Sequence, residues 1–407
     1  MAAGLLVWLW VEASVTTLGA VHARARSPLM ALGPDSFGAT PKAASGLLFQ
    51  DSKAALTRAA IAQQELLDPN TRQIGLPKRK RPTVMKKRGG GGKKKAITGG
   101  GGFGAGAQGL SVQQQENLLR KETLLEDGVC LVENVLSRED AETLRVCVAD
   151  ELAKAYAAVE RNVSQSLGRF NVPHETHDPL RGYLLLPLRD EQSVAEGVNQ
   201  GPMVRSLDKL LQDGAMLGDL FSSVCGGDQS EWYDLVALRT EAGAARQIIH
   251  SDTPFQKVPG LYCAFIALQD VRYSMGTTVF IPGTHLNTAQ RRDIMEGQYD
   301  NRRDEALAKA QSRYALLKAG DAVCFDMRTL HAGTANFPLE EGGGQRLLLA
   351  LTFRNRAAKQ ELGHAPNLRP AYRNRGISLG EMRSEFAKEA PFAGLASDGK
   401  PFGDGLH

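Results

Sequence analysis

The sequence predicts a mainly β protein with flanking helices, built on a jelly-roll core of the double-stranded β-helix, or cupin-like, type. From Trp232 onward, short segments either alternate between apolar and polar residues or are continuously apolar, and Gly and Pro separate them. This pattern is typical of strands. Because little helix lies between them, a sandwich or jelly roll is favoured. The predicted strands are 233–239, 246–250, 260–269, 277–281, 322–326 and 346–354, with a helical insert at about 287–317.

The segment before these strands is predicted to contain two helices and one strand. Residues 113–125 have a helical pattern, and 128–135 is rich in Val and Leu, which favours a strand. Ser137 is a predicted helix N-cap, because its hydroxyl can accept hydrogen bonds from the first free backbone amides. The acidic residues that follow it suit the positive end of a helix. We expect this helix to end near Val159.

Charge is distributed unevenly along the 407 residues. Residues 1–110 hold 16 Lys and Arg against 5 Asp and Glu, whereas residues 111–407 hold 33 against 40. We expect 1–110 to be a targeting-like leader followed by a disordered, basic Gly/Lys-rich linker, and 111–407 to be one folded domain. Because that domain is acidic overall, nucleic acid is not its expected partner. The domain's oligomeric state stays open.

The leader favours entry into an organelle, either a plastid or the secretory route, with the nucleus as the alternative. Its apolar run 5–10 is followed by small residues and a candidate cleavage site at 21–23, and then by an Arg- and Ser-containing stretch. An accidental apolar start is the other interpretation. Three basic runs lie among glycines, at 77–82, 86–88 and 93–95. They are interpreted as a solvated linker, with a nuclear import signal or a tether to an anionic surface as alternatives.

Two further classes of protein are disfavoured. No run of 18 or more apolar residues exists, so no transmembrane segment is expected. The five cysteines are scattered and odd in number, which argues against a disulfide framework, and no pair has the spacing of a zinc site. They are Cys130, Cys147, Cys225, Cys263 and Cys324.

The sharpest local motif is His250-Ser251-Asp252, at the end of a predicted strand. Positions i and i+2 of a strand share a face, so the imidazole and the carboxylate would lie side by side. One more histidine would complete a two-histidine, one-carboxylate set, which leaves open positions on a ferrous ion. His331 is the preferred third ligand, because it follows a turn into a buried strand; His285 fits a surface or supporting role at least as well. A solvated strand end is the alternative interpretation.

Taken in order, these residues resemble the phytanoyl-CoA dioxygenase family of iron(II)/2-oxoglutarate oxygenases. The resemblance covers about residues 115–356. The ordered set is far more specific than any one motif. The segments that carry it are 127–137, 250–252, 265–271, 276–285, 320–331 and Arg346.

The resemblance implies that His250, Asp252 and His331 bind Fe(II), and that Arg346 binds the distal carboxylate of 2-oxoglutarate. Thr277 is a further candidate contact of the cosubstrate. An arginine on a buried strand needs an anionic partner, although a protein carboxylate could also be that partner. Such enzymes consume 2-oxoglutarate and O2, release succinate and carbon dioxide, and hydroxylate a small-molecule or acyl substrate. Related halogenases lack the carboxylate ligand, so Asp252 favours hydroxylation.

Three features depart from the family pattern. Ile249 stands where many members have an aromatic residue, and 338–344 lengthens the loop before Arg346. Gly333 stands two residues after His331, where members often carry a hydroxyl. The second polar contact to the cosubstrate is therefore left open, with Thr277 or Thr278 as candidates.

Two rival functions remain. One is a non-catalytic jelly-roll binding module, tethered by the basic linker to an anionic partner. The other is a metal-binding cupin that does not use 2-oxoglutarate. The intact set of His250, Asp252 and His331 together with Arg346 argues against the binding module, which has no chemical need for all four. Arg346 alone argues against the cupin, which needs no arginine on the buried strand. The substrate pocket is expected from 165–235 and 285–318, with a lid at 169–187. Whether His174, His177, Arg181 or Gln247 contact substrate is open.

Overall fold

The computed structural model of the chain describes residues 72–73, 111–162, 169–170, 179–189, 200–297, 301–359 and 362–393. Contacts divide the chain into two units. The fold below belongs to the unit of Arg72–Gln360 and Pro366–His407. The expected leader, its cleavage site, the basic runs, and His174 and His177 lie outside the described residues, so those expectations stay predictions.

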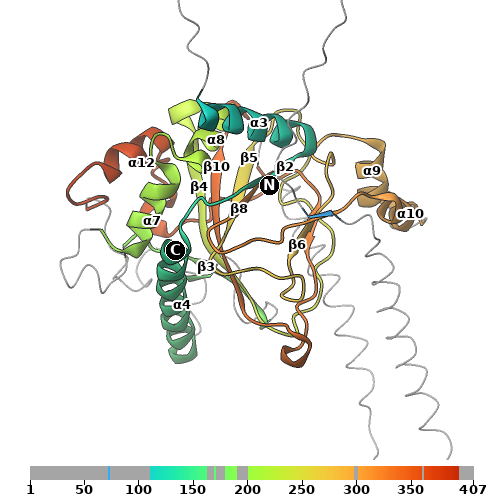
Figure 1. The fold of residues 1–407 in the computed structure, drawn as a ribbon, viewed down its shortest axis with the longest axis horizontal. Coiled ribbons are helices and arrows are strands. Elements are labelled where there is room, and N and C mark those ends of the chain that lie inside the picture. Colours follow the sequence, from blue (N-terminus) through green and yellow to red (C-terminus); the bar gives the residue numbers. More distant parts are fainter. Residues whose placement is uncertain are drawn as a thin grey trace, which may run out of the picture. The chain divides into compact units, whose positions relative to one another are not determined.

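Two β-sheets form the core of this unit (Figure 1). The large sheet has six antiparallel strands, in the order β2-β8-β5-β10-β4-β3. They are β2 (Val129–Val132), β8 (Ala322–Asp326), β5 (Leu261–Ala267), β10 (Arg346–Arg354), β4 (Glu231–Thr240) and β3 (Arg181–Leu185). The small sheet has the order β1-β7-β6-β9, formed by β1 (Arg72–Gln73), β7 (Arg313–Tyr314), β6 (Thr278–Phe280) and β9 (His331–Gly333).

The chain passes back and forth between the two sheets. β5 lies in the large sheet, β6 in the small, β8 in the large, β9 in the small and β10 in the large. This alternation is the winding of a jelly roll, so the predicted fold class is confirmed. The aromatic rings of Phe280, Phe325 and His331 pack the two sheets together, with centroids of Phe280 and Phe325 5.0 Å apart.

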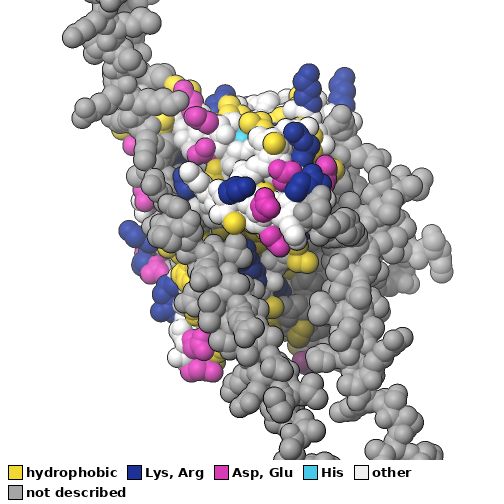
Figure 2. Space-filling model, turned by 90° about the vertical axis from the view of Figure 1, so that its right-hand side faces the viewer, with side chains coloured by type: hydrophobic (Ala, Val, Ile, Leu, Met, Phe, Trp, Pro, Cys, Tyr) yellow, Lys and Arg dark blue, Asp and Glu magenta, His cyan; other side chains and the backbone are white. Residues whose placement is uncertain are grey.

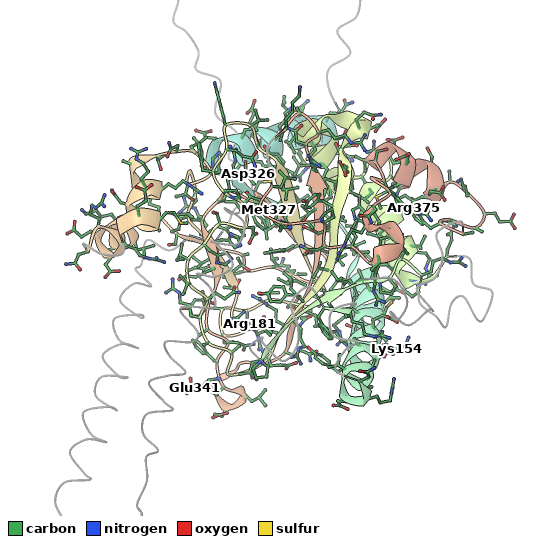
Figure 3. All side chains as sticks on the ribbon, turned by 180° about the vertical axis from the view of Figure 1, so that it is seen from behind. Lys154, Arg181, Asp326, Met327, Glu341 and Arg375 are labelled. Carbon is green, nitrogen blue, oxygen red and sulfur yellow. The ribbon has the colours of Figure 1, made fainter. Side chains whose placement is uncertain are left out.

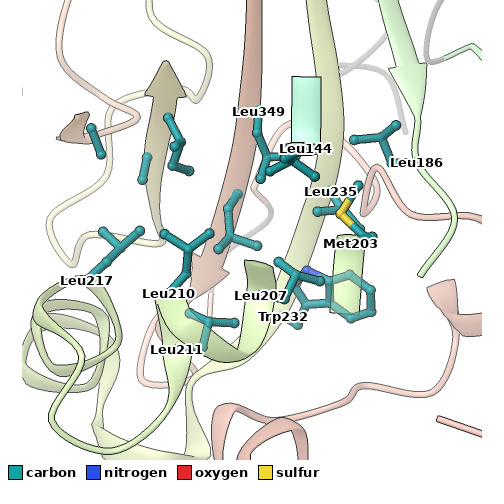
Figure 4. Close-up of a cluster of buried hydrophobic side chains, with 14 of the residues drawn as sticks. Leu144, Leu186, Met203, Leu207, Leu210, Leu211, Leu217, Trp232, Leu235 and Leu349 are labelled. Carbon is teal, nitrogen blue, oxygen red and sulfur yellow. The ribbon is translucent and has the colours of Figure 1, made fainter. Parts of the chain in front are cut away.

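Helices cover the outer face of the large sheet (Figures 1 and 4). They are α3 (Val112–Asp127), α4 (Arg138–Arg161), α7 (Pro202–Leu211), α8 (Met216–Cys225), α11 (Pro370–Arg373) and α12 (Leu379–Phe386). Figure 4 shows leucines of α7 and α8 against Leu235 of β4 and Leu349 of β10, all fully buried. Burying apolar side chains of this size is the main source of stability. The outer face of the sheet therefore belongs to the core and the inner face is left for chemistry.

Most predicted elements are confirmed, with bounds shifted by a few residues. The strand at 346–354 matches β10, and the helix capped by Ser137 is α4, whose cap hydroxyl accepts from the amide of Asp140. The predicted insert contains α9 (Ala289–Glu296) and α10 (Arg302–Lys309), but it ends in β7. The lengthened loop before Arg346 contains a short 3-10 turn, Leu339–Glu341.

Three predictions of local structure are wrong. No strand covers 246–250, where only His250 forms an isolated bridge, with His331. His331 is not at the exit of the strand 322–326, since it opens the separate strand β9. The strand β3 was expected to be part of a lid, but it is the edge strand of the large sheet.

None of the five cysteines forms a disulfide bond in the described residues. No helix among the described residues is both long and apolar enough to cross a membrane. On the face drawn in Figure 2, basic and acidic side chains are interspersed with hydrophobic ones.

Candidate metal centre

The structure brings the three predicted metal ligands together. One ligand atom from each of His250, Asp252 and His331 lies within 4.8 Å of the others. Nε2 of His250 is 3.5 Å from Oδ1 of Asp252, and Nε2 of His331 is 3.4 Å from Oδ2 of the same carboxylate. Both imidazoles therefore turn the same nitrogen toward one carboxylate, which fits a single metal ion bound by two nitrogens and one oxygen.

The backbone pairs the two histidines directly. The amide of His250 donates to the carbonyl of His331 at 3.0 Å, and the amide of His331 donates back at 2.8 Å. This two-way pairing fixes the spacing of the two imidazoles, whose ring centroids lie 4.6 Å apart. The expected side-by-side placement of residues 250 and 252 thus arises at a bridge followed by a bend, and not along a regular strand.

The loop that carries Asp252 is held by two neighbouring segments. The amide of Asp252 donates to the carbonyl of Met327 at 3.0 Å, just beyond β8. The guanidinium of Arg291, on α9, donates to the hydroxyl of Ser251 at 3.2 Å and to the carbonyl of Arg328. The helical insert therefore holds the loop that carries Asp252 in place beside the two histidines.

Backbone carbonyls orient both imidazoles. Nδ1 of His250 lies 2.7 Å from the carbonyl of Ile248, and Nδ1 of His331 lies 3.0 Å from the carbonyl of Thr329. A proton on each Nδ1 satisfies these carbonyls and leaves the lone pair on Nε2 for a metal ion.

Burial and charge act differently on the two histidines. Burial lowers the pKa of His331, and Asp252 only partly offsets this effect. Burial also lowers the pKa of His250, but the hydrogen bond and charge of Asp252 outweigh it, so the pKa of His250 is raised. The side chain of His250 is 39% exposed, whereas that of His331 is 5% exposed. The centre is therefore more open to solvent on the side of His250 than on the side of His331.

Arg346 lies on the inner face of the large sheet and is 4% exposed. It donates to the carbonyl of Gly276 and, at 3.1 Å, to the hydroxyl of Thr240, while its Nε has no hydrogen-bond partner. Both acceptors are neutral. Burial, followed by the charge of Arg181, lowers the pKa of Arg346 to about 10. The guanidinium is thus positioned to bind an anion.

The side chains of Thr277 and His285 are each engaged by a backbone carbonyl. The hydroxyl of Thr277 donates to the carbonyl of Ala315 at 2.5 Å, so its proton is already used. Nε2 of His285 lies 3.1 Å from the carbonyl of Leu125, near the end of α3. Gly128 follows that helix at a φ of +78°, and a Cβ there would lie 2.5 Å from Nδ1 of His285. His285 therefore packs the helix end against the sheet.

Three residues of the inner face were not assigned a role from the sequence. Arg181 and Gln247 were left open, and Tyr183 was not singled out. The only signal in the sequence is an arginine directly before the apolar segment of β3. Gln247 donates to the hydroxyl of Tyr183 at 2.9 Å and accepts from the amide of Gly333 at 2.8 Å.

A jelly roll that brings two histidines and one carboxylate together fits the class of non-haem iron(II) oxygenases. Residues 124–337, more than half of the chain, match the family described as phytanoyl-CoA dioxygenase (PhyH). The chain belongs to the phytanoyl-CoA dioxygenase family. It is an iron(II)-dependent dioxygenase with 2-oxoglutarate and O2 as cosubstrates.

A curated relative and several solved structures are similar to this chain. Dioxygenase cnsJ of Penicillium expansum is 26% identical over 262 residues, which cover 60% of this chain and 68% of that protein. The 2-oxoglutarate-dependent carbocyclase SnoK from nogalamycin biosynthesis is 20% identical, with a TM-score of 0.41, and covers 58% of this chain and 83% of its own. AviO1 from Streptomyces viridochromogenes is 16% identical, with a TM-score of 0.42, over 60% and 97% of the two chains.

Proposed function

We propose that this protein hydroxylates an unactivated C–H bond of a small-molecule or acyl substrate. In the balanced reaction, substrate, 2-oxoglutarate and O2 give hydroxylated substrate, succinate and carbon dioxide. One oxygen atom enters the substrate and the other enters succinate. The observation that carries the proposal is the carboxylate of Asp252, within 3.5 Å of both histidine Nε2 atoms. A carboxylate ligand leaves no place for a halide, so hydroxylation is favoured over halogen transfer.

The proposed metal ligands are His250, Asp252 and His331. When bound there, iron supplies the activation of O2 and the oxidation of the C–H bond. The chain's own residues position the reactants. The carbonyls that hold each Nδ1 fix the imidazoles before metal binds, and Arg346 aligns the cosubstrate through its distal carboxylate. A guanidinium is suited to this task because its planar fork matches a carboxylate.

The segments beside the ligands support a substrate with an apolar portion. Ile248, two residues before His250, is 57% exposed, and Phe255, three residues after Asp252, is 42% exposed. The ring of Phe255 lies near the guanidiniums of Arg291 and Arg328, at 5.7 and 6.0 Å. Exposed apolar side chains within three residues of two metal ligands could contact an apolar portion of the substrate, which is why such a substrate is proposed.

The first experiment is an anaerobic titration of the full chain with iron(II) and 2-oxoglutarate. Chelation of iron by the keto and carboxylate oxygens of 2-oxoglutarate gives a weak visible charge-transfer band. We expect the band in the parent protein, its loss in His331→Ala and its weakening in Arg346→Ala. Absence of the band in folded, iron-loaded parent protein would contradict the proposed function.

A substrate screen then tests the reaction type. Candidate acyl and small-molecule substrates are incubated with O2, and succinate is measured together with the product. A product that has gained one oxygen atom, in a 1:1 ratio to succinate, supports hydroxylation. A product of unchanged oxygen content, formed with the same succinate yield, would mean that the reaction is of another type.

A further inference from the structure

Two buried arginines lie in one row across three neighbouring strands. Arg346 of β10 pairs with Thr240 of β4, and Thr240 pairs with Arg181 of β3. Because directly paired residues share a face of the sheet, all three side chains point to the same side. Arg181 and Arg346 are 5% and 4% exposed. In Figure 3, Arg181 lies between Met327, which anchors the metal loop, and Glu341 at the far end of the unit.

The hydroxyl of Thr240 joins the two guanidiniums. It accepts from Nη2 of Arg346 at 3.1 Å and from Nη1 of Arg181 at 3.4 Å. The other group of Arg181, Nη2, donates to the carbonyls of Ala245 and Thr334 at 2.5 and 3.5 Å. Both Nη atoms lie within hydrogen-bond distance of one hydroxyl oxygen. They are therefore close enough together for a single carboxylate to accept a hydrogen bond from each of them.

This row adjoins the metal centre. Tyr183 lies two residues after Arg181 on the same face of β3. Burial raises its pKa, both arginines lower it and the carboxylate of Asp252 raises it again. The Tyr183 hydroxyl therefore lies close enough to both arginines and to Asp252 for their charges to shift its pKa. Gln247 continues the connection from the Tyr183 hydroxyl to the backbone of β9, where His331 lies.

The side chains of Gln247 and Arg181 fill the space beside Gly333. A Cβ at this position would lie 2.7 Å from Oε1 of Gln247 and 3.1 Å from Nη1 of Arg181. The polar group in this space is therefore the guanidinium of Arg181, supported by the amide of Gln247.

We propose that Arg181 and Arg346 bind the distal carboxylate of 2-oxoglutarate together, with Arg181 as a cosubstrate-positioning residue that takes the place of a side chain at 333. This inference rests on the proposed function. Two like charges brought close together inside a protein repel each other, and an anion shared between them removes the repulsion. The pair also makes the site selective, because a 2-oxo acid without the distal carboxylate cannot accept hydrogen bonds from the two Nη groups that meet at Thr240.

The test combines a variant with a change of ligand. Iron(II)-loaded, anaerobic full-chain protein is titrated with 2-oxoglutarate and with 2-oxopentanoate, which has the same carbon chain but no distal carboxylate. The variants are Arg181→Gln and Arg181→Lys. The matched control is Arg239→Gln, on the adjacent position of β4, whose side chain lies over Tyr156 and pairs with Glu241 on the opposite face.

We expect Arg181→Gln to weaken 2-oxoglutarate binding roughly 10- to 100-fold, the range for a hydrogen bond between charged groups. Binding of 2-oxopentanoate should change by less than about threefold, and Arg239→Gln should change neither. Unchanged 2-oxoglutarate affinity, or equal weakening of both acids, would overturn the assignment of Arg181. If Arg181→Gln does not fold, Arg181→Lys decides, since a lysine cannot form the planar contact and 2-oxoglutarate affinity must still fall selectively.

The two proposals fail in different ways. If the parent protein binds neither acid to its iron, the proposed function is wrong. If the parent binds 2-oxoglutarate but does not discriminate against 2-oxopentanoate, the proposed function survives and the shared carboxylate site is wrong.

Discussion

Replacement of Arg346 by methionine is expected to weaken 2-oxoglutarate binding without lowering the stability of the folded protein. Methionine has a similar length and no charge, so it suits a buried strand position. We expect the metal-free and ligand-free variant to be at least as stable as the parent protein. This result would be unusual, because most substitutions of buried residues destabilise.

The expected magnitude follows from the environment of the guanidinium. A pKa lowered from 12.5 to about 10 corresponds to about 3 kcal/mol against the charged form in the folded protein. Below pH 10 the arginine is charged, so the full cost is present at neutral pH. Methionine removes this cost but also removes the hydrogen bonds to Gly276 and Thr240, at about 1 kcal/mol each. The net expectation is a gain of about 1 kcal/mol.

Urea unfolding at pH 7 measures the stability of the ligand-free protein and its stabilisation by bound ligands. The midpoint of the metal-free variant should equal or exceed that of the parent. Iron and 2-oxoglutarate, added anaerobically, should stabilise the parent by mass action and the variant much less. Arg239→Met is the control, since this arginine pairs with Glu241 and its loss should not stabilise. A variant that is about 2 kcal/mol less stable without ligands would refute the reasoning, because the charge would then be compensated within the chain.

Three further substitutions test the site and the fold. His331→Ala should abolish binding of iron(II) or nickel(II) in a titration, whereas His285→Ala should keep it, because His285 serves the packing of a helix end. Leu349→Ala, at a fully buried position of the large sheet, should lower the free energy of unfolding by about 2–5 kcal/mol, measured with urea. Asp140→Asn should cost about 0.5 kcal/mol at pH 7, since the hydrogen bond with Lys209 lowers the pKa of Asp140. That stability is present above pH 3.8 and is lost as the pH falls through the lowered pKa, so parent and variant should converge once the pH lies below that pKa.

Regular elements were predictable because their patterns are local. The apolar run at 346–354 predicts the central strand β10, and the cap at Ser137 predicts α4, since each signal lies within a few residues. The strand predicted at 246–250 fails for a structural reason. Its partner β9 has only three residues, so the segment pairs at the amides of Gln247 and His250 alone.

The metal ligands were partly predictable for the same reason. The motif at 250–252 is short, and His331 follows a recognisable turn and buried strand. Arg181 could not be assigned, because its role depends on the register of three strands that lie far apart in sequence. The edge strand β3 was missed as well: its inward-facing residues include Arg181 and Tyr183, which break the apolar alternation expected of a strand.

The two faces of the large sheet explain why function concentrates where the pattern breaks. The outer face is covered by helices and is wholly apolar near Leu235 and Leu349, so it can be read from hydrophobicity. The inner face carries polar residues in a row, and the groups that accept hydrogen bonds from Arg346 are both neutral. A bound ferrous ion with Asp252 would carry one net positive charge, and Arg346, whose hydrogen-bond acceptors are neutral, carries another. A dianion that reaches from the metal to Arg346, as 2-oxoglutarate can, offsets that charge. The inner face is thus built for a ligand that the chain itself does not supply.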